Sequence, residues 1–352
     1  MKIAVLVSGG VDSSVALKLL IDQGHNVTAF YLKIWLEDEL SFLGECPWEE
    51  DLKYVEQVCK QLDVPLDVIS LQKEYWDRVV SYAISEVKAG RTPNPDIMCN
   101  LRIKFGSFYD KIDSSFEKVA TGHYARIEET PDGFLLKTAP DPIKDQTYFL
   151  SHLNQEQLSR ALFPIGNLAK EEVRRLAHEF DLPNKDRKDS QGICFLGKIK
   201  FDEFLREHLG DKTGDIIEYE TNKKVGEHRG FWFHTIGQRK GLGLSGGPWF
   251  VVAKDPEKNI VFISKDYFSA EKERNEFDVV DCHWIIDKLP TVKELRVKLR
   301  HGVSFYPCTL TMEDKNKGHV VLSTRDQGIA SGQFAVFYDE DVCLGCGVMI
   351  SR

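Results

Sequence analysis

The first part of the chain alternates short apolar runs with apolar positions at helical spacing. Apolar runs rich in β-branched residues cover residues 3–7, 27–32 and 66–71, as in parallel strands that are buried on both faces. Between them, apolar residues recur at helical spacing over 13–24 and 52–62. Strands that alternate with helices predict an α/β domain with a doubly wound parallel sheet.

The same alternation continues to about residue 200. We expect the further elements to be helices over 74–88, 155–162 and 170–180, a strand over 119–126, and a hairpin around 131–133. The long helix should end at Gly90.

Beyond residue 200 the pattern changes to short strands separated by glycine-rich turns. Strands are predicted over 216–219, 231–236, 249–254, 260–264, 295–299, 308–312, 319–323 and 333–338, and the helix over 201–209 is a candidate linker. Short strands at regular spacing are typical of small β domains. We therefore expect three domains: an α/β domain over 1–200, a central β-rich domain over 201–270, and a C-terminal β-barrel over 271–352.

Composition narrows the class of protein. The chain has 352 residues, 42% of them hydrophobic and 29% charged, which suits two or three ordinary globular domains. No segment approaches the ~18 uninterrupted apolar residues of a membrane span. Because the chain enters a strand at Ile3, no room is left for a signal peptide, and the expected location is cytoplasmic.

Charge and cysteine content point in the same direction. The net charge of −9 argues against a generally sticky nucleic-acid binder but allows local basic patches. Basic residues of the central domain that suit a phosphate backbone are Lys223, Lys224, His228, Arg229, Arg239 and Lys240. In a reducing compartment, the eight cysteines are better explained as core residues, metal ligands or catalytic thiols than as a disulfide scaffold.

A glycine-rich loop, Ser8–Ser14, separates the first predicted strand from the first predicted helix. Its two glycines allow a tight turn and the helix start adds partial positive charge, so the loop predicts an anion site, above all for phosphate. It is not a Walker A loop, because no Gly-Lys-Ser/Thr follows at the required spacing. The alternative is a glycine turn whose Asp12 and Ser13 merely cap the helix, but nucleotide-binding α/β domains place their loop after the first strand.

Cys99 follows a proline-rich segment, Arg91–Asn100. Two prolines separated by one residue predict a rigid loop, after which an amphipathic helix should begin near Arg102. Cys99 would then lie at or near a helix N-terminus beside Arg102 and Lys104, an environment that favours a reactive thiolate. Asp96 is a candidate to exchange a proton with a bound substrate.

Two further cysteine patterns stand out. Cys194 ends a strongly charged loop that starts at Lys185, and it could meet Cys99 over the binding edge of the α/β domain. Cys343 and Cys346 have the spacing of a zinc knuckle or a redox pair but no obvious second pair of ligands, although Cys282 and Cys308 could be recruited. The simpler interpretation of Cys343 and Cys346 is two strand or turn residues of a barrel.

Motifs in the first part of the chain stand in a characteristic order: Ser8–Ser14, Asn94–Asn100, Thr121–Tyr124, Lys144–Leu150 and Asp189–Phe195. Others follow at Gly214–Ile216, His234–Leu242, Pro248-Trp249 and Gly332–Tyr338. This order resembles the tRNA-specific 2-thiouridylases of the MnmA family, which belong to the PP-loop ATP pyrophosphatases. The resemblance covers essentially the whole chain, and it implies an adenine nucleotide α-hydrolase-like fold for the first domain.

The resemblance implies ATP-dependent 2-thiolation of the wobble uridine, position 34, in the anticodon stem-loop of tRNA. ATP would adenylate the C2 carbonyl oxygen, and a cysteine persulfide would deliver sulfur, forming 2-thiouridine, AMP and pyrophosphate. Mg²⁺ would accompany ATP, with no tightly bound cofactor and no dedicated metal ligands. The implied sulfur source is a cysteine desulfurase with its relay proteins, and a monomer is expected.

The resemblance also implies roles for individual residues. Cys99 would be the nucleophile, Cys194 the persulfide carrier and Asp96 the general acid or base. ATP would lie against Leu6, Val7, Ser8, Gly9, Gly10, Val11, Asp12, Ser13, Leu32 and Gly122. The implied tRNA contacts are Asn94, Pro95, Asp96, His123, Lys144, Asp145, Gln146, Arg300, His301 and Gln333.

This chain departs from the family pattern at two places. Two other functions are alternatives to thiolation. Leu32 stands where the family often has methionine, a volume-conserving change, and Arg300-His301-Gly302 replaces a more basic Arg-Tyr-Arg. Cys99 releasing free sulfide is a variant that stays open. A PP-loop synthetase of the argininosuccinate or NAD type would share the loop without needing paired cysteines, and an RNA-binding protein without chemistry would form no AMP.

Overall fold

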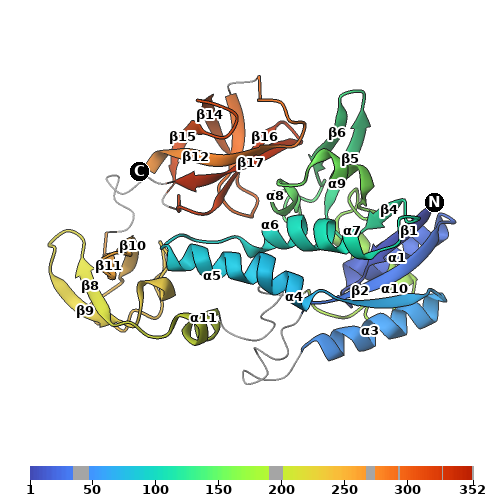
Figure 1. The fold of residues 1–352 in the computed structure, drawn as a ribbon, viewed down its shortest axis with the longest axis horizontal. Helices are drawn as coiled ribbons and strands as arrows, with labels where there is room; N and C mark the ends of the chain where they lie inside the picture. The colour runs from blue at the N-terminus through green and yellow to red at the C-terminus, as the bar shows by residue number, and fades with distance from the viewer. Residues whose placement is uncertain (35–46, 190–200, 267–273, 292–293, 327, 351–352) are drawn as a thin grey trace.

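The N-terminal domain is built on a parallel sheet (Figure 1). The structure is a computed structural model that describes residues 1–34, 47–189, 201–266, 274–291, 294–326 and 328–350. The strand order is β3-β2-β1-β4-β7, and every pair is parallel. The strands are β1 (Lys2–Leu6), β2 (Asn26–Lys33), β3 (Leu66–Ser70), β4 (Lys118–Ala120) and β7 (Ala161–Leu162). The predicted α/β fold is confirmed.

Helices cover both faces of this sheet because its strands are apolar on both sides. Ile3 and Val5 pack with Leu17 of α1 and Val58 of α3, whereas Ala4 faces the cluster of the later helices. The helices are α1 (Val11–Asp22), α3 (Pro47–Leu62), α4 (Gln72–Tyr75), α5 (Ser81–Lys88), α6 (Pro95–Cys99), α7 (Phe108–Lys111), α8 (Thr147–Leu150), α9 (Gln155–Arg160) and α10 (Lys170–Glu179). Wider helical turns, η2 (Trp76–Val80) and η3 (Asn100–Ser107), join α4 to α5 and α6 to α7.

The helix predicted over 155–162 is two residues too long. Asn154 caps α9 with a reciprocal pair of hydrogen bonds to Gln157, as in a capping box. Ala161 and Leu162 leave the helix and pair with Val119 and Ala120 of β4. Pairing at the sheet edge therefore overrides the helical pattern at the end of this segment.

The central domain is a four-stranded sheet with the order β10-β11-β8-β9. Its elements are α11 (Phe201–Leu209), β8 (Gly214–Glu218), β9 (Lys224–His228), η4 (Phe231–Phe233), β10 (Phe250–Asp255) and β11 (Ile260–Ser264). The strand predicted over 231–236 is wrong, because the chain turns at Gly230 (φ +150°) and Phe231 and Trp232 pack on one another, with ring centroids 5.1 Å apart. Strand β9 was not predicted.

The C-terminal domain is the expected β-barrel, with the strands β12 (Arg274–Trp284), β13 (Glu294–Lys298), β14 (Tyr306–Met312), β15 (Gly318–Asp326), β16 (Phe334–Asp339) and β17 (Val342–Ile350). Strand β12 pairs with both β15 and β17 and closes the sheet. Cys343 and Cys346 are fully buried in β17, and burial raises the pKa of Cys346 to about 12. They are strand residues, and no group of metal-ligating side chains is found in the described part of the chain.

The barrel and the N-terminal domain share one sheet. The hairpin of β5 (Ala125–Thr130) and β6 (Gly133–Thr138) lies in the N-terminal half, yet β6 pairs with β17 through Leu136 and Cys343. In Figure 1 this hairpin stands beside the barrel, and the central domain lies at the far end of α5. None of the described helices is long and apolar enough to cross a membrane.

Candidate active site

The loop between β1 and α1 is held by its own serine hydroxyls. Ser13 Oγ accepts the Ser8 N–H at 3.2 Å and donates to the Gly10 carbonyl at 3.1 Å, and Ser14 Oγ donates to the same carbonyl at 3.1 Å. Gly9 has a φ of +74°, which glycine adopts without strain. The N–H groups in the first turn of α1 lack helical partners, so together with the helix dipole they favour an anion at the carboxyl end of the sheet.

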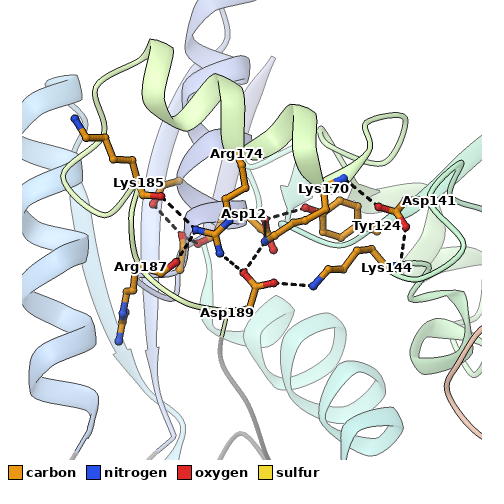
Figure 2. Close-up of polar contacts among 12 residues, drawn as sticks. Asp12, Tyr124, Asp141, Lys144, Lys170, Arg174, Lys185, Arg187 and Asp189 are labelled. Atoms are coloured by element: carbon orange, nitrogen blue, oxygen red, sulfur yellow. Dashed lines mark hydrogen bonds and ion pairs between the residues drawn. The ribbon is translucent and has the colours of Figure 1, made fainter.

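Asp12, in the first turn of α1, is tied to a lysine from a distant helix (Figure 2). Lys170 Nζ lies 2.7 Å from Asp12 Oδ1, and the Tyr124 hydroxyl donates to the same oxygen at 2.9 Å. Burial and the Asp12 carboxylate both raise the pKa of Tyr124, so the hydroxyl stays protonated as a donor. Lys170 is the first residue of α10, and α1 packs against α10.

Three cations meet at Asp189. Its carboxylate lies 2.6 Å from Lys144, 2.7 Å from Lys170 and 2.5 Å from Arg174. Burial alone would raise the pKa of Asp189, but the hydrogen bonds from Lys144 and Lys170 outweigh it and hold that pKa well below its usual range. Asp141 accepts the backbone N–H groups of Lys170 at 3.1 Å and Lys144 at 3.2 Å. The result is a network of three cations and three carboxylates next to the Ser8–Ser14 loop.

The back of the loop is clamped through one carbonyl. Asn184 Nδ2 donates to the Gly9 carbonyl at 2.8 Å and to Ser14 Oγ at 2.9 Å, and Arg187 donates to the same carbonyl at 3.1 Å. Arg187 also pairs with Asp51 of α3. A Cβ at Gly9 would lie 2.6 Å from the Asp51 carbonyl oxygen. Space and conformation both therefore require glycine here.

Of these side chains, Lys144 was predicted as a tRNA contact, whereas Lys170, Arg174, Asn184 and Arg187 were not predicted as site residues. Lys170 and Arg174 look like the polar face of an ordinary amphipathic helix, and only the packing of α10 on α1 brings them to the loop. Asn184 and Arg187 lie in or beside the charged segment that precedes Cys194. The density of charge directly ahead of a candidate catalytic cysteine was the one signal that could have indicated them.

The other predicted nucleotide-binding residues surround the loop. A Cβ at Gly122 would lie 2.7 Å from the Ser13 nitrogen, so glycine lets the end of β4 approach the start of α1. Leu32 lies near the carboxyl end of β2, on the strand next to β1. Leu6, Val7 and Val11 are buried, and only their backbone atoms can face a ligand.

The segment before Cys99 is helical where we predicted a rigid loop. Pro95 takes the first position of α6, where proline needs no N–H donor, and Asn94 Oδ1 accepts the Ile97 N–H at 3.2 Å as the N-cap. Cys99 is therefore one turn inside the helix rather than at its N-terminus, and it is 2% exposed. The neighbouring Arg102 donates to the Arg78 carbonyl at 2.7 Å.

Asp96 lies in the first turn of α6 and is partly exposed. Cys194 falls within 190–200, outside the described residues, so its pairing with Cys99 stays a prediction. Asp189 is the last described residue before that segment. The chain therefore enters the Cys194 segment from the centre of the cation cluster.

Several predicted tRNA contacts are buried and bonded inside the protein. His123 is 8% exposed, shares a 2.6 Å hydrogen bond with Thr121 Oγ1 and packs against Phe163. Burial lowers its pKa, so the ring is neutral. Asp145 pairs at 2.8 Å with Lys298 of the barrel, and both side chains are buried.

Of the remaining predicted contacts, Gln146 lies in the N-terminal domain, and Arg300, His301 and Gln333 lie in the barrel. Gln146 Oε1 accepts the Tyr124 N–H at 3.0 Å, and Gln333 Oε1 accepts from the Tyr148 hydroxyl at 3.4 Å. Arg300 pairs with Asp326 at 2.9 Å. The His301 ring packs on Phe149, the centroids 4.6 Å apart, which brings this barrel loop to α8.

The segment that leads into α6 touches both β domains. The Thr92 N–H donates to the Ser331 carbonyl of the barrel at 2.8 Å. On the other side, a Cβ at Gly90 would lie 2.3 Å from Pro256 of the central domain. The helix that carries Cys99 therefore begins where all three domains meet.

Comparison with known proteins covers almost the entire chain. Residues 1–198 match the family model of the tRNA methyl transferase HUP domain, residues 202–265 that of the tRNA methyl transferase PRC-barrel domain, and residues 274–349 that of the aminomethyltransferase beta-barrel domain. Among solved structures, the U34-tRNA thiolase NcsA from Methanococcus maripaludis is 17% identical with a TM-score of 0.36, covering 60% of this chain and 68% of that one. A TM-score this low supports no conclusion.

Full-length relatives give the stronger result. The tRNA-specific 2-thiouridylase MnmA 1 of Bacteroides thetaiotaomicron is 48% identical over 353 residues, which is 99% of each chain. The tRNA-specific 2-thiouridylase MnmA of Parabacteroides distasonis is 46% identical, covering 100% of this chain and 99% of the relative. Identity at this level over the whole length excludes the alternative that this chain shares only the Ser8–Ser14 loop with these proteins. The chain therefore belongs to the family of MnmA tRNA-specific 2-thiouridylases.

Proposed function

We propose that this chain is an ATP-dependent tRNA 2-thiouridylase that replaces the O2 atom of the wobble uridine with sulfur. One observation supports it above the others: η3, which continues directly from the helix of Cys99, lies near the Gly122-His123 segment beside the Ser8–Ser14 loop. Phe105 of η3 packs near the His123 ring, the centroids 6.2 Å apart, and the adjacent Gly122 approaches the backbone of Ser13. The element that follows Cys99 and the Ser8–Ser14 loop are thus linked through Gly122 and His123.

The first step would be adenylation. The C2 carbonyl oxygen is a poor leaving group, so its attack on the α-phosphate of ATP makes it part of a phosphate ester and releases pyrophosphate. The loop N–H groups, with Lys144, Lys170 and Arg174, would neutralise the charge that develops on pyrophosphate. Mg²⁺ would arrive with ATP, and Asp12 is the carboxylate that the loop offers to it.

The second step would exchange oxygen for sulfur. The terminal sulfur of a Cys194 persulfide attacks C2 and AMP leaves, which links the base to Cys194 through a disulfide. The Cys99 thiolate then attacks the Cys194 Sγ atom, 2-thiouridine departs, and a Cys99–Cys194 disulfide remains for an external dithiol to reduce. Asp96, one turn before Cys99, is our proposed proton acceptor or donor.

The tRNA would approach the junction of the three domains. The target base has to leave its stack for this chemistry, and Asn94, Pro95 and Asp96 stand at the start of α6. Because His123 and Asp145 are buried and bonded internally, we propose that they position this region rather than contact RNA. The gaps between the three family matches support domain boundaries near 200 and 270.

The test is reconstitution of the reaction with unmodified tRNA, ATP and a persulfide-forming cysteine desulfurase. Cys99→Ser and Cys194→Ser are each expected to abolish 2-thiouridine, measured by mass spectrometry of tRNA nucleosides, while ATP binding survives. Cys282→Ser, which alters a partly exposed barrel cysteine, is the control and should thiolate normally. Full thiolation by either of the first two variants would refute the two-cysteine scheme.

The same assay separates the competing functions. A small-molecule synthetase would release AMP without regard to tRNA, and an RNA-binding protein would release none. The family models mention methyl transfer, and methylated nucleosides in place of 2-thiouridine would favour that reaction. Our proposal requires AMP release that depends on tRNA.

A further inference from the structure

A second cavity lies away from the phosphate loop, between the central domain and the segment that leads into α6. Its volume is about 150 Å³, enough for one phosphate group with some water, since a water molecule occupies about 30 Å³. In Figure 1 the C-terminal end of α5 faces the central domain at this place. Residues that line the cavity include Arg91, Pro93, Pro95, Trp232, His234 and Lys254.

Two side-chain nitrogens of residues that line the cavity are buried and have no hydrogen-bond partner. They are Nε1 of Trp232 and Nδ1 of His234, and the His234 side chain belongs to a residue only 6% exposed. The indole N–H can only donate, and an imidazole can present an N–H as well. Native proteins rarely leave buried polar groups unpaired. Two such groups at one cavity indicate a missing ligand with acceptor atoms.

The charged residues of the wall are Lys254, Arg91 and Asp202. Within the described residues, no carboxylate lies at ion-pair distance from Lys254, and burial lowers the pKa of its ammonium group to about 8. Lys254 also acts on His234, whose pKa is lowered by burial and by nearby positive charge. The exposed Asp202 lines the same cavity, and Arg91 is already paired with Glu86. An anion in this cavity would offer a partner to the Lys254 ammonium and acceptor atoms to the unpaired groups of the lining residues Trp232 and His234.

We propose that this cavity binds a phosphate group through Trp232, His234 and Lys254. Two sources offer that chemistry, a backbone phosphate of bound tRNA and a free phosphate ion. Pro93 and Pro95 belong to the cavity wall and lead into the helix of Cys99, so a tRNA phosphate bound here would anchor the RNA next to the reacting thiol. Assignment to tRNA rests on the proposed function, whereas binding of the ion does not.

The first arm of the test uses inorganic phosphate and the full chain. Phosphate, compared with chloride at equal ionic strength, is expected to raise the melting temperature of the unaltered protein. Lys254→Met and Trp232→Phe should each show a smaller rise, and what remains is the effect of phosphate at the Ser8–Ser14 loop. The second substitution keeps an aromatic side chain but removes the indole N–H together with part of the ring volume. Lys258→Met, on the exposed turn between β10 and β11, is the matched control and should respond like the unaltered protein.

The second arm measures tRNA affinity by fluorescence anisotropy at several salt concentrations. If the phosphate belongs to tRNA, Lys254→Met weakens binding about tenfold and lowers the slope of log affinity against log salt by about one. An effect of phosphate without any change in tRNA affinity assigns the cavity to the free ion.

The proposal is overturned if neither Lys254→Met nor Trp232→Phe differs from Lys258→Met in either arm. The result that would refute the proposed function differs from the result that would refute phosphate binding in the cavity. A chain that binds phosphate here but forms no 2-thiouridine would refute thiolation and leave the cavity proposal standing.

Discussion

Lys170 lies between two carboxylates at the edge of the parallel sheet. Its ammonium is 2.7 Å from both Asp12 and Asp189, and its side chain is 13% exposed. Arg174, one turn further along α10, reaches the same Asp189. The phosphates of ATP would compete with Asp189 for these cations, because both present negatively charged oxygens to the same donors. Lys170 is therefore the side chain on which nucleotide binding should depend most.

Replacing Lys170 with methionine should weaken ATP binding roughly 10- to 100-fold, the range that one lost charged hydrogen bond implies. Isothermal titration calorimetry without tRNA measures this directly, and Lys170→Arg should retain much of the affinity. Lys18→Met, which removes a surface lysine paired with Asp22 on α1, should bind ATP normally. An affinity for ATP within twofold of the unaltered protein in Lys170→Met would show that the lysine serves structure alone.

At the scale of elements, local patterns predicted most of the parallel sheet and much of the barrel. Runs of apolar residues identify β1 and β2 because those strands are largely buried on both faces. The edge strand β3 is partly exposed, with Val68 49% exposed, and it was identified from its apolar and β-branched residues alone. The missed strand β12 carries charged residues such as Glu276 and Asp278, and it is specified by its two partner strands rather than by its own alternation. Long-range pairing of this kind leaves little trace in a single sequence.

The residues of the candidate site also differ in whether the local sequence alone predicts them. The loop Ser8–Ser14 is contiguous in the sequence, so its glycines and serines predict an anion site without knowledge of the fold. The cations at Asp189 come from α10 and from the turn before α8, and their role exists only after these segments pack together. At α6, the two prolines suggested a loop, but a capping asparagine and a proline at the first position start a helix instead.

The cap of α6 can be tested against a second asparagine cap in the same chain. Asn94→Ala and Asn154→Ala each remove a side chain that accepts the N–H three residues on. Each should lower the free energy of unfolding by about 1 kcal/mol, measured by urea denaturation. Only Asn94→Ala should also reduce thiolation, because only α6 carries Cys99.

The substitution Asn94→Asp separates capping from contact with the target base. Aspartate caps a helix as well as asparagine does but lacks the amide donor. Recovery of thiolation would assign Asn94 to holding α6, whereas recovery of stability without activity would assign it to the base. Equal loss of thiolation in Asn154→Ala would contradict a special role for this helix.

At the scale of the whole molecule, a buried ion pair joins the N-terminal domain to the barrel. Lys298 of β13 and Asp145 of the N-terminal domain lie 2.8 Å apart, with side chains 1% and 2% exposed. Asp145 also accepts hydrogen bonds from Thr147 and from the Ala139 N–H. The pair stands close to the shared sheet of β6 and β17, so it couples the position of the barrel to the segment that carries Lys144.

Lys298→Met should destabilise the protein by about 3–5 kcal/mol, because it leaves the Asp145 charge buried without a partner. The double variant Asp145→Asn/Lys298→Met should recover most of that loss, since the amide is neutral and still accepts hydrogen bonds. Lys317→Met, which breaks an exposed pair with Glu313 in the same barrel, should cost less than about 1 kcal/mol. Urea unfolding of the four proteins measures these differences. A double variant no more stable than Lys298→Met would mean that the lysine contributes mainly through contacts other than its pair with Asp145, such as its ammonium over the Phe305 ring.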